Sequence, residues 1–233
     1  MPPTGRVVIV VDACVVLPTI NEADNIAILI PALHYYLGSI PHEVVVVDDA
    51  STDGTPKIAS ELGAFVIERP MRLGLGSAIH TGVMHCVRAN ALVAVVMDAD
   101  LQHPPITVPK LVKACVGGSD VCVGVRVGRE SLPPHRRLVS RVAEFLGELA
   151  YGDGVPDLMS GFFAINLGTM RDYILDFNPT PRNYKYLLEF LLFLRRRGVV
   201  PRVANIPYRQ LGRLSGSSKM GIGEVTAYLT TVL

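Results

Sequence analysis

The 233-residue chain contains no tryptophan, and only 6% of its residues are aromatic. It also lacks the roughly 18–20 consecutive apolar residues that a helix needs to cross a bilayer. The apolar run Val7 to Leu17 is broken by Asp12 and leads into Pro18, so we interpret it as a strand rather than a signal peptide. We therefore expect a cytoplasmic protein, and the mean hydropathy of +0.36 allows it to lie peripherally on the cytoplasmic face of a membrane.

Cysteine spacings typical of metal or redox sites are missing as well. Each of the four cysteines stands singly in apolar surroundings, with no CxxC or Cys/His pattern nearby. We therefore expect buried free thiols in a reducing compartment. The residues concerned are Cys14, Cys86, Cys115 and Cys122.

A strong net charge is also absent, because the formal charge at pH 7 is +1. The two parts of the chain differ, however. Residues 1–125 carry 7 Lys and Arg against 12 Asp and Glu, whereas residues 126–233 carry 15 against 9. The acidic part suits a metal-assisted site, and the basic part suits phosphate groups or an anionic membrane surface. We expect no nucleic-acid partner.

Over its first 125 residues the chain alternates short β-branched runs with helical stretches. This alternation predicts an α/β fold with a central, mostly parallel sheet covered by helices on both faces. The predicted strands are Val7–Leu17, Glu43–Val47, Ala64–Ile67, Ala91–Met97 and Val121–Val125. The predicted helices are Asp24–Leu37, Thr55–Leu62, Leu75–Ala89 and Pro105–Val116.

The pattern loosens after residue 126. We expect an exposed loop over residues 128–137, followed by the helices Arg137–Leu149 and Tyr184–Arg197, the strand Arg202–Pro207 and the amphipathic helix Gly221–Leu233. Without repeats or low-complexity tracts, one domain over residues 1–233 is the economical interpretation. It would comprise a nucleotide and metal half to about residue 125, an acceptor-side half over about 126–220, and a candidate membrane-surface helix over 221–233.

Polar clusters follow four of the predicted strands, where ligands bind in parallel sheets. In the cluster over residues 98–102, alternate positions of an extended strand end point the same way. The side chains of Asp98, Asp100 and Gln102 can therefore converge. Such hard oxygen ligands suit Mg²⁺ or Mn²⁺. The alternative is a strand end whose acids merely cap the next helix.

A second cluster, over residues 48–55, follows the strand Glu43–Val47. Its carboxylates can accept hydrogen bonds from ribose hydroxyls or a base edge, and we expect Asp49 to do so. Glu22, after the first strand, can act in the same way. The alternative is a turn rich in Asp, Ser and Gly before a helix, a role that suits Asp53.

Six segments, in order along the chain, form a specific pattern that covers about Val15 to Tyr228. They are Pro18–Glu22 (PTINE), Asp48–Thr55 (DDASTDGT), Gly74–Ala78 (GLGSA), Asp98–Pro105 (DADLQHPP), Asp157–Phe163 (DLMSGFF) and Arg213–Met220. The pattern resembles family 2 glycosyltransferases, specifically dolichol-phosphate mannosyltransferases and related polyprenyl-phosphate glycosyltransferases. It departs from the family at three positions: Ile20 replaces a common aromatic, Leu158 a usual proline, and Ser217 a usual acid.

The resemblance implies a GT-A fold and inverting transfer of mannose from GDP-mannose to dolichyl or another polyprenyl phosphate at a membrane surface, assisted by Mg²⁺ or Mn²⁺. It assigns the nucleotide sugar to Pro18, Ile20, Glu22, Val47, Asp49, Asp98, Ala99, Asp100, Arg213 and Lys219, and the metal to Asp98, Asp100 and Gln102. The implied catalytic residues are Asp100, Arg126, Arg136 and Ser140, with Lys185 a further phosphate-binding candidate. A lipid monophosphate, whose second pKa is about 6, needs no general base.

Three alternatives remain open. A sugar nucleotidyltransferase would carry a glycine-rich basic loop after the first strand, but Pro18 to Glu22 contains no glycine. A catalytically silent scaffold of the same fold is disfavoured because both the acidic and the basic residue sets are complete. A polyprenyl-phosphate glucosyltransferase that uses UDP-glucose is the nearest alternative among enzymes.

Overall fold

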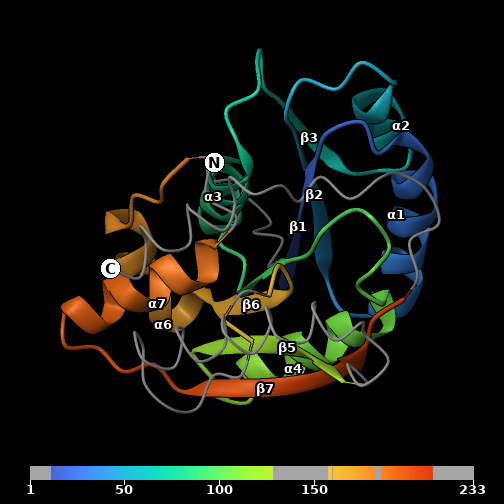
Figure 1. The fold of residues 1–233 in the computed structure, drawn as a ribbon. Helices are drawn as coiled ribbons and strands as arrows, with labels where there is room; N and C mark the ends of the chain where they lie inside the picture. The colour runs from blue at the N-terminus through green and yellow to red at the C-terminus, as the bar shows by residue number, and fades with distance from the viewer. Residues whose placement is uncertain (1–11, 128–156, 159, 182–184, 212–233) are drawn as a thin grey trace, which may run out of the picture.

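A computed structural model describes residues 12–127, 157–158, 160–181 and 185–211. In this part of the chain a seven-stranded sheet has the order β3-β2-β1-β4-β6-β5-β7 (Figure 1). The strands are β1 Ala13–Thr19, β2 His42–Asp48, β3 Phe65–Glu68, β4 Val93–Val96, β5 Val121–Val127, β6 Phe163–Asn166 and β7 Val203–Arg209. The helices are α1 Ala23–Leu37, α2 Thr55–Glu61, α3 Leu75–Arg88, α4 Val108–Val116, α6 Leu167–Asp176 and α7 Tyr186–Arg196.

The predicted mostly parallel sheet is confirmed. Only β6 runs antiparallel, to β4 on one side and β5 on the other, and all remaining strand pairs are parallel. The carboxyl ends of the six other strands therefore meet at one edge of the sheet. Because β6 runs the other way, the residues just before it arrive at this same edge.

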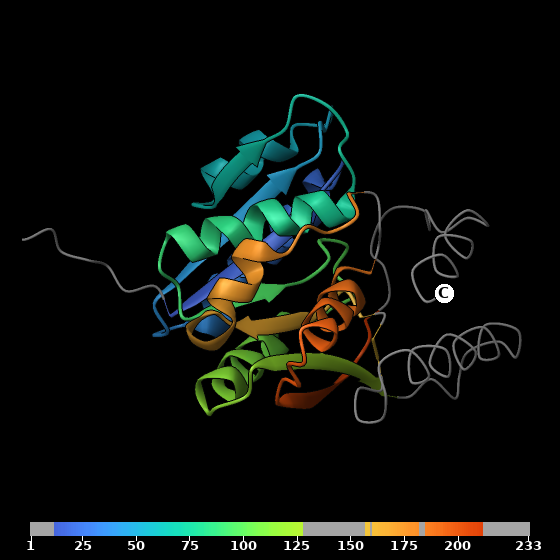
Figure 2. The same cartoon turned by 90° about the vertical axis from the view of Figure 1, so that its left-hand side faces the viewer.

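Alternate residues of each strand enter two cores on opposite faces of the sheet, as the period of two in a strand requires. In β1, Cys14 and Val16 belong to the first core, whereas Val15 and Leu17 belong to the second. Helices α3, α6 and α7 cover the first core, and α1 and α4 cover the second. Figure 2 shows α3 and α6 crossing one face of the strands.

Most of the predicted elements are confirmed, including the late helix and strand that the structure has as α7 and β7. The strand β1 extends through Pro18 to Thr19, further than predicted, and α4 starts only at Val108 because Pro105 opens a separate 3-10 turn. Both β6 and α6 were missed. The predicted loop 128–137 and the helices Arg137–Leu149 and Gly221–Leu233 lie outside the described residues. No described helix is both long and apolar enough to cross a membrane.

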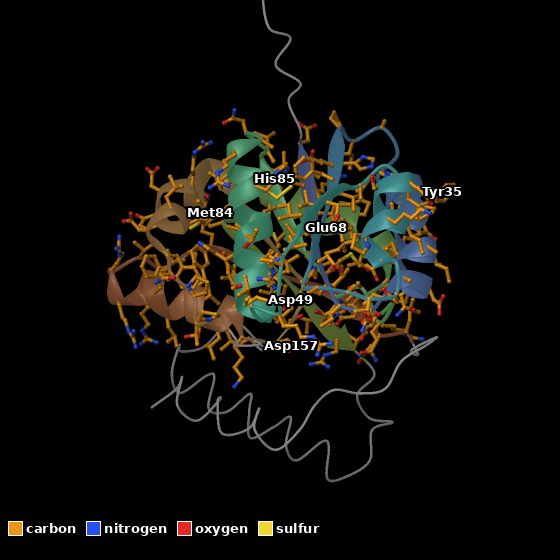
Figure 3. All side chains as sticks on the ribbon, turned by 90° about the horizontal axis from the view of Figure 1, so that it is seen from above. Tyr35, Asp49, Glu68, Met84, His85 and Asp157 are labelled. Carbon is orange, nitrogen blue, oxygen red and sulfur yellow. A yellow bond between two sulfur atoms is a disulfide. The ribbon has the colours of Figure 1, made fainter. Side chains whose placement is uncertain are left out.

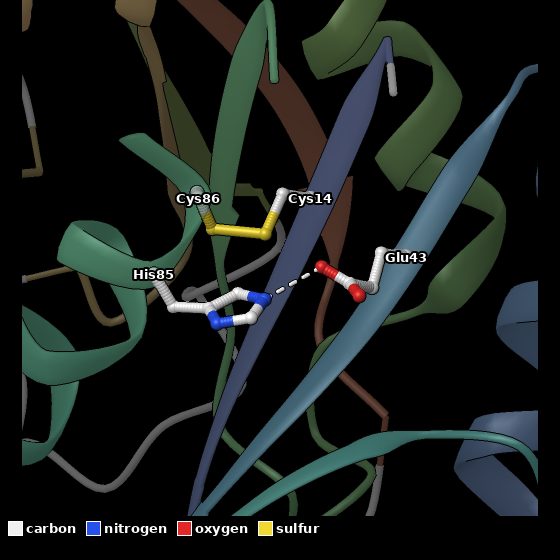
Figure 4. The surroundings of a disulfide bond; sticks show 4 residues. All are labelled: Cys14, Glu43, His85 and Cys86. Atoms are coloured by element: carbon white, nitrogen blue, oxygen red, sulfur yellow. Dashed lines mark hydrogen bonds and ion pairs between the residues drawn. A yellow bond between two sulfur atoms is a disulfide. The ribbon is translucent and has the colours of Figure 1, made fainter. Parts of the chain in front are cut away.

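The prediction of four free thiols is wrong for Cys14 and Cys86, which form a disulfide (Figure 4). Cys14 of β1 faces α3 in the first core, and its Cα lies 5.7 Å from that of Cys86, within the range that a disulfide spans. Local spacing gives no information about such a pair, because the two residues are 72 positions apart. Because Cys14 and Cys86 are bonded, the cysteines no longer indicate a reducing compartment. Cys115 and Cys122 are buried and free, as predicted.

Replacing both bonded cysteines, as Cys14→Ala with Cys86→Ala, should lower the free energy of unfolding by about 4 kcal/mol. The reason is that the bond closes a loop of roughly 70 residues in the unfolded chain. Urea unfolding followed by circular dichroism measures the loss. A reductant should lower the stability of the wild-type protein by more than that of the variant, because only the wild type has the Cys14–Cys86 bond to lose. Equal stability of wild type and variant without reductant would contradict the expectation.

Candidate active site

The loops that follow β1 and β2 are joined by backbone-to-side-chain hydrogen bonds. Asn21, which has a φ of 53°, donates its N–H to Ser51 Oγ over 2.8 Å and accepts from the N–H of Thr52 at 2.8 Å. The N–H of Glu22 donates to Thr55 Oγ1 over 3.0 Å. These contacts hold the start of α1 against the start of α2. They give the first polar cluster of the sheet edge a defined shape.

Asp53 completes this connection between the loops. Its carboxylate accepts from the hydroxyl of Thr55 at 2.6 Å, from the N–H of Thr55 at 3.0 Å and from the N–H of Ala23 at 3.0 Å. Partial burial acts to raise the pKa of Asp53, but these hydrogen bonds outweigh it and lower the pKa below its ordinary value. The contacts agree with the turn-stabilising role expected for Asp53.

Asp49 anchors the loop that leads from β3 into α3. Its Oδ1 accepts from the N–H of Leu73 at 2.7 Å and lies 2.6 Å from Arg69, while its Oδ2 accepts from the N–H of Gly74 at 3.0 Å. Arg69 also donates to the carbonyl of Gly74 at 3.0 Å and to Ser77 Oγ at 2.5 Å. Sequence reasoning identified Asp49 and missed Arg69, because only the fold brings the two together.

Burial of Arg69 lowers its pKa, although the charge of Asp49 opposes the shift. The guanidinium keeps its charge regardless, since an arginine is not deprotonated in a protein. The side chains of Arg69 and Asp49 are only 5% and 12% exposed. Each therefore depends on the other for compensation of its charge. A carboxylate offers about four lone-pair sites, so Asp49 can accept a further donor from a ligand.

The loop after β4 presents the predicted metal ligands. Ala99 and Leu101 are buried, and Leu101 adopts a φ of 63°. The strand β4 ends at Val96 and residues 99–101 form a bend, so the predicted extended strand end is not present. Burial nevertheless alternates, and Asp98, Asp100 and Gln102 are only partly buried. The N–H of Gln102 donates to Asp100 Oδ1 over 3.1 Å. This arrangement keeps the three oxygen-bearing side chains on the solvent-facing side of the loop.

Among the described residues, no three His, Cys, Asp or Glu side chains are grouped to hold a metal. The predicted ligand set is not such a group, because its third member, Gln102, is an amide. It nevertheless fits Mg²⁺ or Mn²⁺. Such ions bind to one or two carboxylates and take further ligands from substrate phosphates and water.

His103 packs against residues 98–102, the metal loop, from the protein interior. Its ring is buried, stacks on Phe162 with centroids 4.9 Å apart, and accepts through Nδ1 from the N–H of Asp98 at 3.2 Å. Burial, assisted by the charge of Arg126, lowers the pKa of His103 to about 3. The ring is therefore neutral at physiological pH and carries its proton on Nε2. Its 3.9 Å approach to the Asp98 carboxylate is not an ion pair.

Arg126, near the end of β5, brings positive charge to this edge. Its Nε donates to Asp157 over 3.2 Å, and the Asp157 side chain is 3% exposed against 33% for Arg126. Burial alone would lower the pKa of Arg126. The charges of Asp157, Tyr208 and Asp98 outweigh burial and raise it. Figure 3 shows Asp49 and Asp157 towards one end of the molecule and His85 towards the other.

Gly161 lies against the Asp98 carboxylate. A Cβ added to Gly161 would lie 2.8 Å from Oδ2 and 3.0 Å from Oδ1 of Asp98, closer than real Cβ contacts. The neighbouring Ser160 donates to the carbonyl of Gly124 over 3.0 Å and accepts from the N–H of Phe162 at 3.1 Å. The segment before β6 is thus held in place, and a side chain at position 161 would require the Asp98 carboxylate to move.

The remaining predicted site residues are either wholly or partly buried in the fold or lie outside the described residues. Pro18 and Val47 are buried within β1 and β2, so neither presents its side chain to a ligand. Ile20 is partly buried, and Lys185 is 4% exposed at the start of α7. The remaining predicted residues lie outside the described residues: Arg136, Ser140, Arg213 and Lys219.

The sequence profile of glycosyl transferase family 2 matches residues 14–173. The chain belongs to this family. It is 35% identical over 225 residues to a dolichol-phosphate mannosyltransferase of Pyrococcus furiosus, covering 92% of this chain and 61% of that protein. It is 33% identical over 160 residues to a polyprenol monophosphomannose synthase of Mycolicibacterium smegmatis, covering 64% and 60%. The chain therefore spans about three fifths of the length of these relatives.

Solved structures show the same fold. A glucosyl-3-phosphoglycerate synthase from Mycobacterium tuberculosis, in complex with Mn²⁺, UDP-glucose and phosphoglyceric acid, matches with a TM-score of 0.69 at 22% identity. The match covers 94% of this chain and 79% of that one. The same synthase with Mg²⁺ and UDP also gives 0.69, at 23% identity, covering 94% and 78%. The GT-A fold that the resemblance implied is confirmed.

Gly161→Ala should weaken binding of Mn²⁺ in the presence of GDP by about 10- to 100-fold. Such losses are typical when the support of a metal ligand is disturbed. The physical reason is that the new Cβ would displace the Asp98 carboxylate. Electron paramagnetic resonance of Mn²⁺ measures the change without an activity assay.

Gly82→Ala is the matched control for this variant. Its new Cβ would clash with the Val16 side chain in the first core and with no atom of residues 98–102. We expect Gly82→Ala to lower stability while the folded protein keeps its Mn²⁺ affinity. Unchanged Mn²⁺ affinity in Gly161→Ala would contradict the proposed role of the Gly161 contact.

Arg69→Met should lower the free energy of unfolding by about 3–5 kcal/mol, because it leaves the buried Asp49 carboxylate without its cation. Adding Asp49→Leu should recover part of that loss, since the unpaired charge is then removed. Urea unfolding of the wild type, both single variants and the double variant measures the coupling free energy between the two side chains. Strictly additive effects would show that the two side chains do not depend on each other.

Proposed function

We propose that this protein transfers mannose from GDP-mannose to dolichyl or another polyprenyl phosphate, with inversion, giving a β-linked mannosyl phosphate. The observation that carries the proposal is the 35% identity to the dolichol-phosphate mannosyltransferase over 92% of this chain. The acids and the arginine at the carboxyl edge of the sheet support it independently.

The nucleotide would bind over the loops that follow β1 and β2. Asp49 has lone pairs available for a donor on the base or ribose, and Glu22 stands across from it on the adjoining loop. The position lies beside the paired strands β1 and β4, where the order of strand connections reverses. Ligands of open α/β sheets bind at such a reversal.

The diphosphate would lie over the loop after β4. Asp98, Ala99 and Asp100 would face it there. Asp98, Asp100 and Gln102 would hold Mg²⁺ or Mn²⁺, which when bound neutralises charge that develops on the departing nucleoside diphosphate. Gly161 and His103 would keep Asp98 in position, through the close Cα approach and the Nδ1 hydrogen bond.

The acceptor phosphate would attack the anomeric carbon of the sugar in line with the departing diphosphate. It is mostly a dianion near pH 7, because its second pKa is about 6, so no residue has to remove a proton. The buried His103 ring already accepts a hydrogen bond from the N–H of Asp98, so its role is structural. This agrees with a mechanism in which no histidine acts as a general base. Arg126 would hold the attacking phosphate, because its guanidinium is always charged and remains 33% exposed beside its ion pair with Asp157. The resemblance adds Arg136, Ser140, Arg213 and Lys219.

A lipid acceptor would bring the protein to the cytoplasmic face of a membrane as a peripheral protein. The proposed division of the chain follows from this: donor and metal binding in residues up to about 125, acceptor binding over about 126–220, and a membrane-surface helix over 221–233. The basic balance of residues 126–233 suits the anionic headgroups of such a surface.

The test is transfer of radiolabel from GDP-mannose into organic-extractable lipid, with dolichyl phosphate and Mn²⁺ or Mg²⁺. Label that appears in the lipid phase and disappears with EDTA is the expected result. Label from UDP-glucose instead would keep the site and correct the sugar. Failure with every donor, while nucleotide still binds, would overturn the enzymatic proposal in favour of a silent scaffold.

Asp100→Ala and Arg126→Ala should each reduce transfer by at least about 100-fold without unfolding the protein. The reason is that each removes charge which the transition state needs. Arg197→Ala is a matched control, because Arg197 pairs with Asp176 at 2.7 Å on the surface and is assigned no role in binding or catalysis. It should retain the wild-type rate. Wild-type rates in folded Asp100→Ala or Arg126→Ala would rule out the proposed mechanism.

A further inference from the structure

The two cysteines outside the disulfide lie against each other. Cys115, in the last turn of α4, and Cys122, in β5, have their Sγ atoms 3.1 Å apart. Both residues are 0% exposed. A disulfide S–S bond measures about 2.04 Å, so the sulfurs need to approach by only about 1 Å to bond.

The pair repeats the arrangement of the Cys14–Cys86 disulfide on the other face of the sheet. Each pair joins a covering helix to the strand beneath it, α3 to β1 in one case and α4 to β5 in the other. One pair lies in the first core and the other in the second. The fold therefore accommodates a helix-to-strand disulfide in this kind of packing.

The backbone between Cys115 and Cys122 is already held in place. The side-chain amide of Asn166, at the end of β6, donates to the carbonyl of Cys115 over 3.0 Å and to that of Ser119 over 3.4 Å. The N–H of Ser119 donates to the carbonyl of Ala114 over 3.2 Å. Bond formation therefore needs side-chain movement rather than rebuilding of the turn.

The hydrogen bond between the two thiols distinguishes their reactivity. Cys115 donates to the sulfur of Cys122, which raises the pKa of Cys115 and lowers that of Cys122. A side-chain hydrogen bond with Ser119 lowers the pKa of Cys122 further. Cys122 is therefore the sulfur that loses its proton first, and a thiolate is the species that attacks a disulfide.

We propose that Cys115 and Cys122 form a second, reversible disulfide that joins α4 to β5 within the second core. The co-reactant is a small-molecule disulfide such as oxidised glutathione. The Cys122 thiolate attacks one of its sulfurs and releases one small thiolate. Cys115, deprotonated in turn, attacks the sulfur of Cys122 in the mixed disulfide and releases the second. The two cysteines lose two protons and two electrons, and the co-reactant becomes two thiols.

Burial determines when this exchange takes place. Since neither sulfur is exposed, a bulky disulfide reaches them only while the chain folds or while the end of α4 opens locally. Once formed, the bond would tie α4, which follows the metal loop, to β5, which carries Arg126. It would act on the stability of this part of the fold rather than on the chemistry, because both cysteines lie at the opposite ends of these elements from the carboxyl edge.

The test is refolding of the full chain from denaturant with reduced and oxidised glutathione. The product is then denatured, its remaining thiols are alkylated, and the unreduced peptides are analysed by mass spectrometry. We expect one peptide pair linked through Cys14 and Cys86 and another through Cys115 and Cys122, with no alkylated cysteine. Alkylation of both Cys115 and Cys122 beside an intact Cys14–Cys86 link would overturn the proposal, and so would crossed pairings between the two faces.

Cys115→Ser provides the matched control, since it should leave Cys122 alkylated and the Cys14–Cys86 link unchanged. The melting temperature supplies a second readout. Oxidised wild-type protein should melt about 5–10 °C above oxidised Cys115→Ser, as expected for a bond that closes a short loop in a chain of this size. Equal melting temperatures together with a confirmed link would overturn the stabilising role.

Discussion

Parallel pairing of β1 with both β2 and β4 is the constraint on which the rest of the structure depends. It aligns the three strands so that Thr19 and Asp48 end at matching positions, while β4 ends earlier, at Val96 opposite Val16. Each of these strands is buried on both faces, so its chain can carry polar groups only where it leaves the sheet. The chemistry of the molecule is therefore confined to one edge, and loops far apart in sequence meet there.

Opposite charges at this edge stabilise one another. Asp49 binds Arg69 beside β2, and Asp157 binds Arg126 beside β5, so each acid is matched by a cation from another loop. The one antiparallel strand matters here, because β6 delivers Asp157 and Gly161 to the edge where the parallel strands end. Gly161 then permits the close approach of the Asp98 carboxylate, which an added Cβ would push away. The two anionic substrates of the proposed reaction would require such balanced charge.

The repetition of Val-rich runs predicted β2 to β5 and the helices between them, because buried parallel strands are continuous and apolar. Alternation within residues 98–102 likewise predicted which side chains face outward. The strand β6 was missed because Phe163 to Asn166 is only four residues long and has no β-branched run. The Cys14–Cys86 bond and the Asp49–Arg69 pair were missed for a different reason. The packing of α3 on β1 brings the two cysteines together, and the parallel pairing of β2 with β3, which sets Asp48 opposite Glu68, brings Asp49 and Arg69 together. No local pattern encodes such pairs.

The most direct measurement is calorimetric titration of GDP into the protein with Mn²⁺ and again with EDTA, using the wild type and Asp98→Asn. We expect the wild type to lose at least about tenfold in affinity without Mn²⁺, because the loop after β4 would hold the diphosphate through the ion. Asp98→Asn should bind GDP weakly under both conditions. Tight binding of GDP that depends on neither Mn²⁺ nor Asp98 would contradict the assignment of this edge as a metal-assisted nucleotide site.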